Sequence, residues 1–357
     1  MAFLTLYRNK LEENFTFLDQ MFAGRGIHWG VVSKILCGNA LYIRELLALG
    51  VTEVHDSRIS NLRKVKSLAP DVQTVYIKPP AKRSIPGIVR HADVSFNTEL
   101  ATIRMLSSEA VRQQKQHKVI IMIEMGDLRE GVMGDELVDF YRQVLSMPNI
   151  TISGIGTNLN CLNGVMPTQD KLIQLSLYKQ LVEAKLGISI PWVSGGTSVA
   201  IPLILRNVRP MAVNHFRIGE ALFFGKDLFT GHTIDGMNDE VFRLSAEIIE
   251  INEKPAIPSG ELGPNVTGSV QEIPDAGDLG ATSLRAILDI GLLDMQPQYL
   301  IPDDSGVALI DASSDMLVAD ISGSTQSYSV GDVISFKLQY MGALYLLNSA
   351  YVEKRIA

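Results

Sequence analysis

Cysteine and long apolar runs are scarce in this sequence of 357 residues. The two cysteines, Cys37 and Cys161, cannot build a disulfide framework, and neither lies in a Cys-x-x-Cys motif. No apolar stretch reaches the roughly eighteen residues of a membrane span, and the amino terminus lacks the apolar core of a signal peptide. We therefore expect a cytoplasmic protein with no membrane partner.

Positive charge is also in short supply. The chain carries 32 Lys and Arg against 39 Asp and Glu, which gives a net charge of -7, and it has no run of basic residues. A nucleic-acid-binding protein would show a basic patch or stripe, so we expect no nucleic-acid partner. The six histidines have no metal-ligand spacing, so no metal site is predicted. These absences favour a small molecule as the partner.

The composition that is present belongs to a folded globular protein. Hydrophobic residues make up 46% of the chain and charged residues 20%, close to the average for globular domains. The length favours about two domains, or one barrel with an appendage. A chain of this size can bury a substantial core.

Residues 30–225 repeat a short apolar run, a polar turn and a stretch of helical periodicity. This rhythm is typical of successive β-α units around a parallel sheet. Helices are expected at 40–49, 98–117, 135–146 and 168–186. Eight such units predict a closed (β/α)8 barrel over residues 1–233. The predicted strands are 30–34, 53–56, 74–78, 94–97, 119–124, 152–158, 192–195 and 216–224.

A second domain is predicted over residues 234–357. Strand-like runs at 243–251, 283–289, 306–310, 317–321 and 333–340 are joined by Gly, Pro, Asp and Ser turns, with few helical patterns. Residues 255–280, rich in Pro and Gly, are expected to form a long irregular loop within this segment. The second domain should therefore be mostly β.

Unusual polar residues fall at the carboxyl ends of the predicted barrel strands, where the active site of such a barrel lies. Lys34 ends the first strand, Arg129 follows the fifth and Asn158 ends the sixth. The run 194–198, Ser-Gly-Gly-Thr-Ser, follows the seventh strand, and Arg217 lies in the eighth. A lysine paired with a later Arg-x-Gly beside small hydroxyl residues suggests covalently held pyridoxal phosphate.

A phosphate site is expected after the last two strands, where backbone N–H groups and a helix start commonly bind such a group. Gly195, Gly196, Ser198 and Gly219 suit that role. By itself the Ser-Gly-Gly-Thr-Ser run could equally be a turn with a helix cap at Ser198. Its position after the seventh strand favours phosphate binding.

The other residues also have plain structural readings. Lys34 could be a surface lysine at a strand end. Arg217 could form a buried ion pair with Glu220 or another carboxylate. Arg129 could be a solvated loop charge, and Cys161 a small buried hydrophobe.

Seven short stretches, in order along most of the chain, resemble the fold-type III pyridoxal phosphate enzymes of the alanine racemase superfamily. The closest resemblance is to the alanine/ornithine racemase family. The matching stretches are Trp29-Gly-Val-Val-Ser-Lys34, Asp56-Ser-Arg-Ile-Ser-Asn-Leu62, Asp127-Leu-Arg-Glu-Gly131, Gly154-Ile-Gly-Thr-Asn158, Ser194-Gly-Gly-Thr-Ser198, Arg217-Ile-Gly-Glu220 and Ala312-Ser-Ser-Asp-Met316.

This resemblance implies a role for each matched residue. Lys34 would hold pyridoxal 5'-phosphate as a Schiff base and carry the substrate α-proton. Arg217 would face the pyridine nitrogen. Ser198, Gly219 and Glu220 would bind the phosphate, the last two through backbone N–H groups.

Two further roles follow from the same resemblance. Asn158 would lie against the cofactor ring, and Arg129 near the substrate carboxylate. An arginine that stays charged opposes protonation of the ring nitrogen, which weakens the electron sink and favours simple return of the proton. Arg217 therefore argues for racemisation, since fold-type III decarboxylases resemble one another in placing a carboxylate there.

The sequence departs from alanine racemases at two motifs. Their catalytic tyrosine follows Ile-Gly, whereas this chain has Leu292 after Ile-Gly. The second base is therefore open, with Cys161 and Asp315 as candidates. Gly38 stands where a phosphate-binding tyrosine would be, so we expect Tyr351 to make that contact instead.

The resemblance implies an amino-acid racemase that acts as a homodimer. Ornithine, lysine, serine or alanine could be the substrate, and the change at Leu292 points away from strict alanine specificity. A decarboxylase, an aldolase or an eliminase on the same cofactor is the alternative, as is a non-catalytic pyridoxal phosphate carrier. The predicted β domain argues against the carrier.

Overall fold

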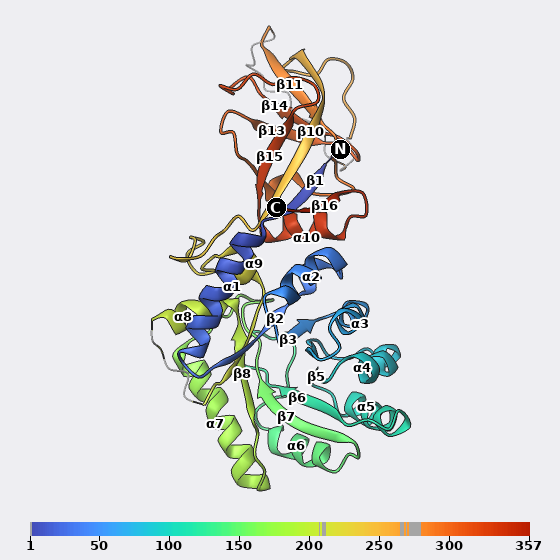
Figure 1. Cartoon of the computed structure of the whole chain (residues 1–357), viewed down its shortest axis with the longest axis vertical. Helices are drawn as coiled ribbons and strands as arrows, with labels where there is room; N and C mark the ends of the chain where they lie inside the picture. Colours follow the sequence, from blue (N-terminus) through green and yellow to red (C-terminus); the bar gives the residue numbers. More distant parts are fainter. Residues whose placement is uncertain (1, 207, 209–211, 265–267, 269, 271–279) are drawn as a thin grey trace. The chain divides into compact units, whose positions relative to one another are not determined.

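The computed structural model describes residues 2–206, 208, 212–264, 268, 270 and 280–357 (Figure 1). They form two compact units: one is Asn9–Asp239, and the other joins Glu240–Ala357 to Met1–Arg8. Much of the predicted irregular loop at 255–280, namely 265–267, 269 and 271–279, lies outside the described residues. Among those that are described, no helix has the length and apolar character needed to cross a membrane.

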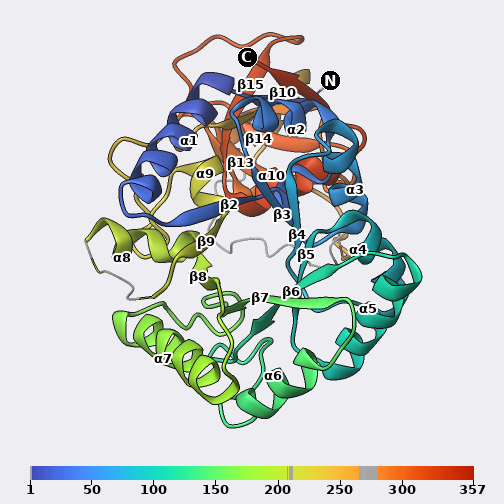
Figure 2. The same cartoon turned by 60° about the horizontal axis from the view of Figure 1, so that its bottom comes forward.

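The first unit is a closed barrel of eight parallel strands, as predicted (Figure 2). Each strand pairs with the next along the chain, and the first pairs with the last, with Gly30 opposite Arg217. The carboxyl ends of all eight strands therefore share one rim. The strands are β2 (His28–Val32), β3 (Glu53–Asp56), β4 (Gln73–Tyr76), β5 (Val94–Asn97), β6 (His117–Met122), β7 (Ile150–Gly156), β8 (Trp192–Thr197) and β9 (His215–Ile218).

Helices surround this barrel on its outer side (Figure 2). Their ends follow local sequence signals: the Asn39 side chain accepts hydrogen bonds from two backbone N–H groups at the start of α2, and Gly187, at φ 65°, ends α7. The helices are α1 (Arg8–Ala23), α2 (Ala40–Ala48), α3 (Ile59–Leu68), α4 (Ile85–His91), α5 (Leu100–Arg112), α6 (Leu137–Leu145), α7 (Gln169–Leu186), α8 (Ile201–Leu205) and α9 (Glu220–Phe224), with 3-10 turns η1 (Lys34–Leu36), η2 (Lys82–Ser84) and η3 (Ser198–Ala200).

The strand predicted at 216–224 was wrong in its second half. Strand β9 ends at Ile218, and the apolar residues that follow form the short helix α9 between Gly219 and Gly225. Gly225 ends the helix in the left-handed region, at φ 58°. A short buried apolar run does not distinguish strand from helix by periodicity, which explains the error.

The second unit is built on an eight-stranded sheet, and the mostly β prediction holds for it. Strand β1 lies between β10, its antiparallel partner, and β16, its parallel partner, so the first residues of the chain pair with the last (Figure 1). The strand predicted to reach 340 stops at Leu338, because a helix starts at Tyr340. The elements are β1 (Phe3–Leu6), β10 (Phe242–Pro255), β11 (Thr282–Leu288), η4 (Pro297–Tyr299), β12 (Leu300–Pro302), β13 (Ala308–Ala312), β14 (Leu317–Asp320), β15 (Val333–Leu338), α10 (Tyr340–Asn348) and β16 (Glu353–Ile356).

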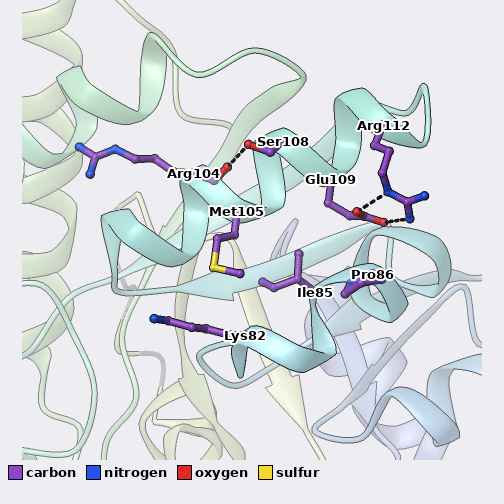
Figure 3. A pocket seen from close by; sticks show the side chains of 8 residues that line it. All are labelled: Lys82, Ile85, Pro86, Arg104, Met105, Ser108, Glu109 and Arg112. Atoms are coloured by element: carbon purple, nitrogen blue, oxygen red, sulfur yellow. Dashed lines mark hydrogen bonds and ion pairs between the residues drawn. The ribbon is translucent and has the colours of Figure 1, made fainter.

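A shallow pocket of about 390 Å³ lies on the outer helix layer of the barrel, between α4 and α5 (Figure 3). Its lining includes Ile85 and Met105, with Lys82 and Arg104 at its edge. None of the residues predicted for chemistry lines this pocket. It is a groove between packed helices, apart from the strand ends.

Candidate functional site

Lys34 follows the end of β2 by two residues, and it is the first residue of the 3-10 turn η1. Its neighbours Ser33, Ile35 and Leu36 are buried, whereas the Lys34 side chain is exposed. The Ser33 hydroxyl donates to Asp56 Oδ2 at 2.8 Å, which ties this turn to the end of β3. The backbone at Lys34 is therefore fixed while its amine is accessible at the rim.

Arg217 is buried in β9, with 3% of its surface exposed. Its guanidinium donates to Ser194 Oγ at 2.6 Å and to the Thr157 carbonyl at 2.9 Å. Burial lowers its pKa to about 10, so it is charged at neutral pH. Within the described residues no carboxylate forms an ion pair with Arg217, which rules out the pairing with Glu220 in this part of the chain.

Asn158, just past β7, lies beside this guanidinium. Its Oδ1 accepts from Arg217 at 3.3 Å, and its Nδ2 is buried without any hydrogen-bond partner. A buried amide donor left unpaired is unfavourable unless a further group accepts from it. The Arg217 side chain also lies over the Phe96 ring, 5.2 Å from its centre. These residues place an unpaired donor beside a guanidinium, which suits a flat polar ring with an acceptor.

The end of β8 and the start of α9 meet at Ser198. The Ser198 hydroxyl accepts from the backbone N–H groups of Gly219 at 3.3 Å and of Ala221 at 3.1 Å. Backbone donors therefore converge where the sequence predicts a phosphate. Burial raises the pKa of Glu220 in the same turn, and the positive charge of Lys34 opposes that rise, which places Glu220 within electrostatic reach of Lys34.

Arg129 and Cys161 lie on the two loops that follow β6 and β7. Arg129 forms an ion pair with Glu130 and is partly exposed, and Cys161 is an exposed free thiol, so Cys161 is not the buried hydrophobe of the alternative reading. Cys161, Glu130 and Arg129 all influence the pKa of Arg217 electrostatically. The structure therefore brings both loops to the neighbourhood of Arg217.

Asp127 holds these two loops together. Its carboxylate accepts from the backbone N–H groups of four residues in the later loop at 3.0 to 3.3 Å. Burial tends to raise the pKa of Asp127, but these donors hold it below its usual value. In the sequence, Asp127 stood out only as the first residue of the matching stretch 127–131. The four residues are Cys161, Leu162, Asn163 and Val165.

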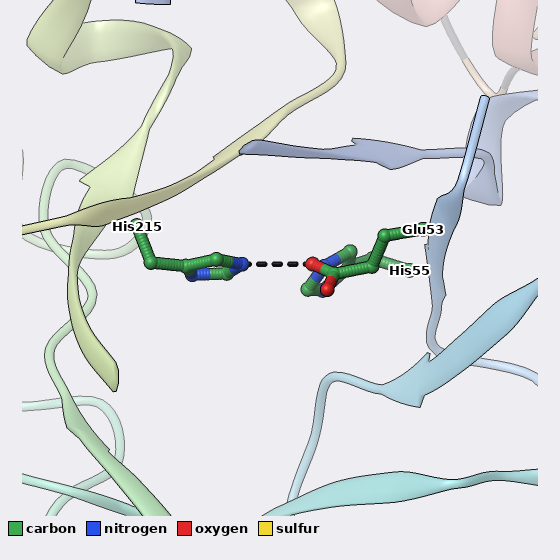
Figure 4. Close-up of side chains that lie close together, drawn as sticks. All are labelled: Glu53, His55 and His215. Carbon is green, nitrogen blue, oxygen red and sulfur yellow. Dashed lines mark hydrogen bonds and ion pairs between the residues drawn. The ribbon is translucent and has the colours of Figure 1, made fainter. Parts of the chain in front are cut away.

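A buried polar cluster inside the barrel was missed by the sequence analysis. The Glu53 carboxylate of β3 points to the ring of His215 on β9, with Oε1 2.8 Å from Nε2 (Figure 4). The same oxygen lies 2.5 Å from His55 Nε2. These two hydrogen bonds hold the pKa of Glu53 far below its usual value although burial opposes this, and burial lowers the pKa of His55 to about 4. The residues are distant in sequence, so only the closed barrel brings them together.

Asp315 and Tyr351, the remaining predicted residues, lie in the second unit. Asp315 is exposed in the turn between β13 and β14. That turn packs on the segment where the expected tyrosine is replaced: Leu292 N–H donates to the Ser313 carbonyl at 2.9 Å, and a Cβ on Gly291 would approach Asp315 N to 2.5 Å. Tyr351 is 79% exposed near the carboxyl terminus.

Comparison with known proteins agrees with this fold and identifies the family. The family described as alanine racemase, N-terminal domain, matches residues 7–227. The chain is 36% identical to the ornithine racemase of Acetoanaerobium sticklandii over 354 residues, 99% of each chain. It is 31% identical to the lysine racemase of Thermotoga maritima over 351 residues, 98% of this chain and 97% of that one.

A solved structure shows the same fold at low sequence identity. Alanine racemase from Bartonella henselae with covalently bound pyridoxal phosphate matches with a TM-score of 0.76 and 16% identity, covering 100% of this chain and 99% of that one. The match to the family model spans the whole barrel that carries Lys34 and Arg217. The chain therefore belongs to the alanine racemase family.

Proposed function

We propose that this chain is a pyridoxal phosphate-dependent racemase whose substrate is an amino acid with a basic side chain, ornithine first among them. The observation that carries the proposal is the placement of an accessible lysine and a buried arginine at the ends of two paired strands, β2 and β9. The two relatives named for ornithine and lysine, each aligned over nearly the whole chain, favour a basic substrate.

The residues at the rim fit pyridoxal phosphate. The exposed Lys34 amine would bond to the aldehyde carbon of the cofactor. The unpaired Asn158 Nδ2 would donate a hydrogen bond to the oxygen on the cofactor ring or to a group beside it. Ser198 and the N–H groups of Gly219 and Glu220 would hold the phosphate. When bound, the cofactor would make the substrate α-proton acidic enough to be removed.

Lys34 Nζ is the proposed base on one face of the substrate. After it takes up the α-proton, the return of a proton from the opposite face inverts the carbon. Cys161 and Asp315 are the candidates for that second group. Cys161 is exposed on a loop within electrostatic reach of Arg217, and Asp315 adjoins the segment that replaces the tyrosine motif.

Arg217 is proposed to control which reaction follows. A guanidinium held by Ser194 and Thr157, with no carboxylate paired to it in the described structure, keeps a positive charge toward the ring. That charge disfavours a protonated ring nitrogen and so favours proton return over decarboxylation or transamination. Arg129 would bind the substrate carboxylate.

We propose further that the enzyme is a cytoplasmic homodimer in which the second unit completes the partner's site. The chain has only two cysteines, Cys37 and Cys161, too few for a disulfide framework, which suits a reducing compartment. The resemblance to this family supports a two-fold dimer, and sedimentation of the active protein would test it. A monomeric active species would contradict it.

One experiment tests the proposed function directly. Purified protein loaded with pyridoxal phosphate is incubated in deuterium oxide with L-ornithine, L-lysine, L-arginine, L-serine and L-alanine, and the products are resolved by chiral chromatography and mass spectrometry. We expect the D-enantiomer with one deuterium at the α-carbon, fastest for ornithine or lysine. Borohydride should fix the cofactor on Lys34, and Lys34→Ala should abolish both signals.

The same products distinguish the alternative functions. Loss of carbon dioxide would indicate a decarboxylase, an aldehyde an aldolase, and a keto acid an eliminase. Cofactor fixed on Lys34 with no exchange of any amino acid would indicate a carrier. Each of these results would contradict the racemase proposal.

A further inference from the structure

Arg217 is joined to a distant carboxylate by an unbroken series of hydrogen bonds. Its NH1 donates to Ser194 Oγ at 2.6 Å, Ser194 Oγ lies 2.8 Å from His215 Nδ1, and His215 Nε2 lies 2.8 Å from Glu53 Oε1. All four residues project from barrel strands β8, β9 and β3. We call Glu53, His215 and Ser194 the relay.

The direction of each bond in the relay follows from its ends. The Glu53 carboxylate only accepts, so His215 Nε2 carries a proton and donates to it, and Glu53 also accepts from Gln73 Nε2 at 2.6 Å. In a neutral His215 ring Nδ1 is then the acceptor, so the Ser194 hydroxyl donates to it, while the Ser194 oxygen accepts from Arg217, which can only donate. Every bond points from the guanidinium toward the carboxylate.

The barrel backbone is shaped to admit the relay. A Cβ on Gly30 would lie 2.3 Å from His55 Nε2 and 2.5 Å from Glu53 Oε1, so only glycine leaves room on β2, the strand between β3 and β9. On β8 the register shifts between Ser194, opposite His215, and Thr197, opposite Arg217. This bulge, with Gly196 at φ 137°, brings the Ser194 hydroxyl between the side chains of His215 and Arg217.

The cluster at Glu53 also has the residue types of a metal site, formed with His55 and His215. Its distances decide against that reading. Three ligands about 2.0 to 2.1 Å from a tetrahedral ion would stand more than 3 Å apart, whereas Glu53 Oε1 is 2.5 and 2.8 Å from the two ring nitrogens. The second Glu53 oxygen is already held by Gln73. These are hydrogen-bond distances.

We propose that Glu53, His215 and Ser194 are positioning residues that hold the Arg217 guanidinium in place and supply its negative counter-charge from a distance. The inference rests on the proposed function, because Arg217 acts on the cofactor ring only if that ring is bound. A carboxylate in direct contact would neutralise the guanidinium locally. The relay instead keeps the carboxylate two groups away, so the charge at the ring is undiminished.

The first test uses the cofactor-free protein and does not depend on activity. Two-bond ¹H–¹⁵N spectra of protein labelled at its six histidines report which ring nitrogen carries the proton. We expect the His215 signal to show a proton on Nε2 and a hydrogen-bonded, unprotonated Nδ1. Ser194→Ala should shift the Nδ1 signal, and His215→Gln identifies it by its loss. A proton on Nδ1 of His215 would overturn the relay, as would a stoichiometric metal ion removed by a chelator.

The second test measures the effect of the relay on the cofactor. Ser194→Ala and Glu53→Gln should weaken binding of pyridoxal phosphate roughly ten- to a hundredfold and shift the absorption band of the bound cofactor, because the hydrogen bonds that fix a charged group are lost.

The matched control for these variants is Ser95→Ala. It breaks a similar buried hydrogen bond in the barrel, 2.8 Å from Ser95 Oγ to His117 Nε2. Neither of these residues is hydrogen-bonded to Arg217 or to the relay. We expect affinity within twofold of wild type and no band shift for it. Equal effects in Ser95→Ala and Ser194→Ala, or no effect in either relay variant, would overturn the role of the relay and leave the proposed function standing. A wild-type protein that binds no pyridoxal phosphate would overturn the proposed function as well.

Discussion

The hydroxyl of Ser33, the residue before Lys34, donates a hydrogen bond to Asp56 Oδ2 at 2.8 Å. Asp56 is buried, and it also accepts from the Arg58 N–H at 2.9 Å and from Asn61 Nδ2 at 3.1 Å. Asp56→Ala would leave these donors unpaired, so we expect the free energy of unfolding to fall by about 3 kcal/mol. The turn that carries Lys34 should lose its anchor, and turnover should fall with it.

Urea titration followed by tryptophan fluorescence measures this loss in the barrel alone. Both tryptophans of the chain, Trp29 and Trp192, lie in the first unit. Asp71→Ala removes an exposed carboxylate from the loop before β4, and its effect should stay within about 0.5 kcal/mol. A similar small effect for Asp56→Ala would show that the anchor contributes little.

The loop after β7 should open when its single carboxylate anchor is removed. Asp127→Ala takes away the acceptor of four backbone N–H groups in residues 161–165, so their hydrogen exchange should accelerate by at least about tenfold. Exchange measured by mass spectrometry checks this, with Asp135→Ala, an exposed loop carboxylate, as the control. Unchanged protection in Asp127→Ala would mean that other contacts hold the loop.

Gly30→Ala should damage the barrel although it adds only one methyl group. The new Cβ would meet His55 Nε2 at 2.3 Å and Glu53 Oε1 at 2.5 Å, and neither group has room to move without losing hydrogen bonds. We expect a destabilisation of about 3 kcal/mol in urea unfolding followed by circular dichroism, which reports on both units. Gly263→Ala, where no atom lies within 4 Å of the added carbon, should change stability by less than about 1 kcal/mol. Equal effects would contradict the close packing at Gly30.

The barrel should lose stability as the pH falls from about 6.5 to about 4. Burial lowers the pKa of His55 and of His117 from 6.5 to about 4. Between these values the unfolded chain binds protons at both histidines and the folded chain does not, so unfolding is favoured by roughly 3 kcal/mol for each. The lowered pKa of Glu53 adds to the loss below 4.5.

His117→Gln tests the sign and size of this effect. The variant keeps a polar partner for Ser95 and removes one of the two protonation sites, so the slope of stability against pH between 6.5 and 4 should become about half as steep. His232→Gln, at an exposed position, should leave the slope as in wild type. If the slope for His117→Gln matches wild type, the burial of His117 does not control acid stability.

The part of the site that could be predicted from the sequence consists of residues at the carboxyl ends of the predicted strands. Lys34, Asn158 and Ser198 each stand just past the carboxyl end of a strand, and Arg217 lies inside one, so their common rim follows from eight parallel strands. The relay could not be predicted, because Glu53 and His215 are 162 residues apart and each is only the polar first residue of a short strand. Gly30, a glycine within β2, was the local signal of this cluster. It can be understood only once Glu53 and His55 are known to lie against it.

The boundary errors have a similar physical origin. Residues 216–224 are mostly apolar, and Gly219 and Gly225 set the change from strand to helix through backbone geometry rather than through hydrophobic pattern. The first strand of the chain was missed because residues 3–6 are only four residues long. Their partners, in β10 and β16, lie more than two hundred residues away.

The strand formed by residues 3–6 bears on how the protein is made. One of its two hydrogen-bonding partners, β10, follows the barrel in the chain, but the other, β16, is Glu353–Ile356. The barrel can close while synthesis continues, but one edge of the strand must wait, unpaired, until β16 is made. A chain that stopped before Glu353 would keep a complete barrel and leave β1 paired with β10 alone.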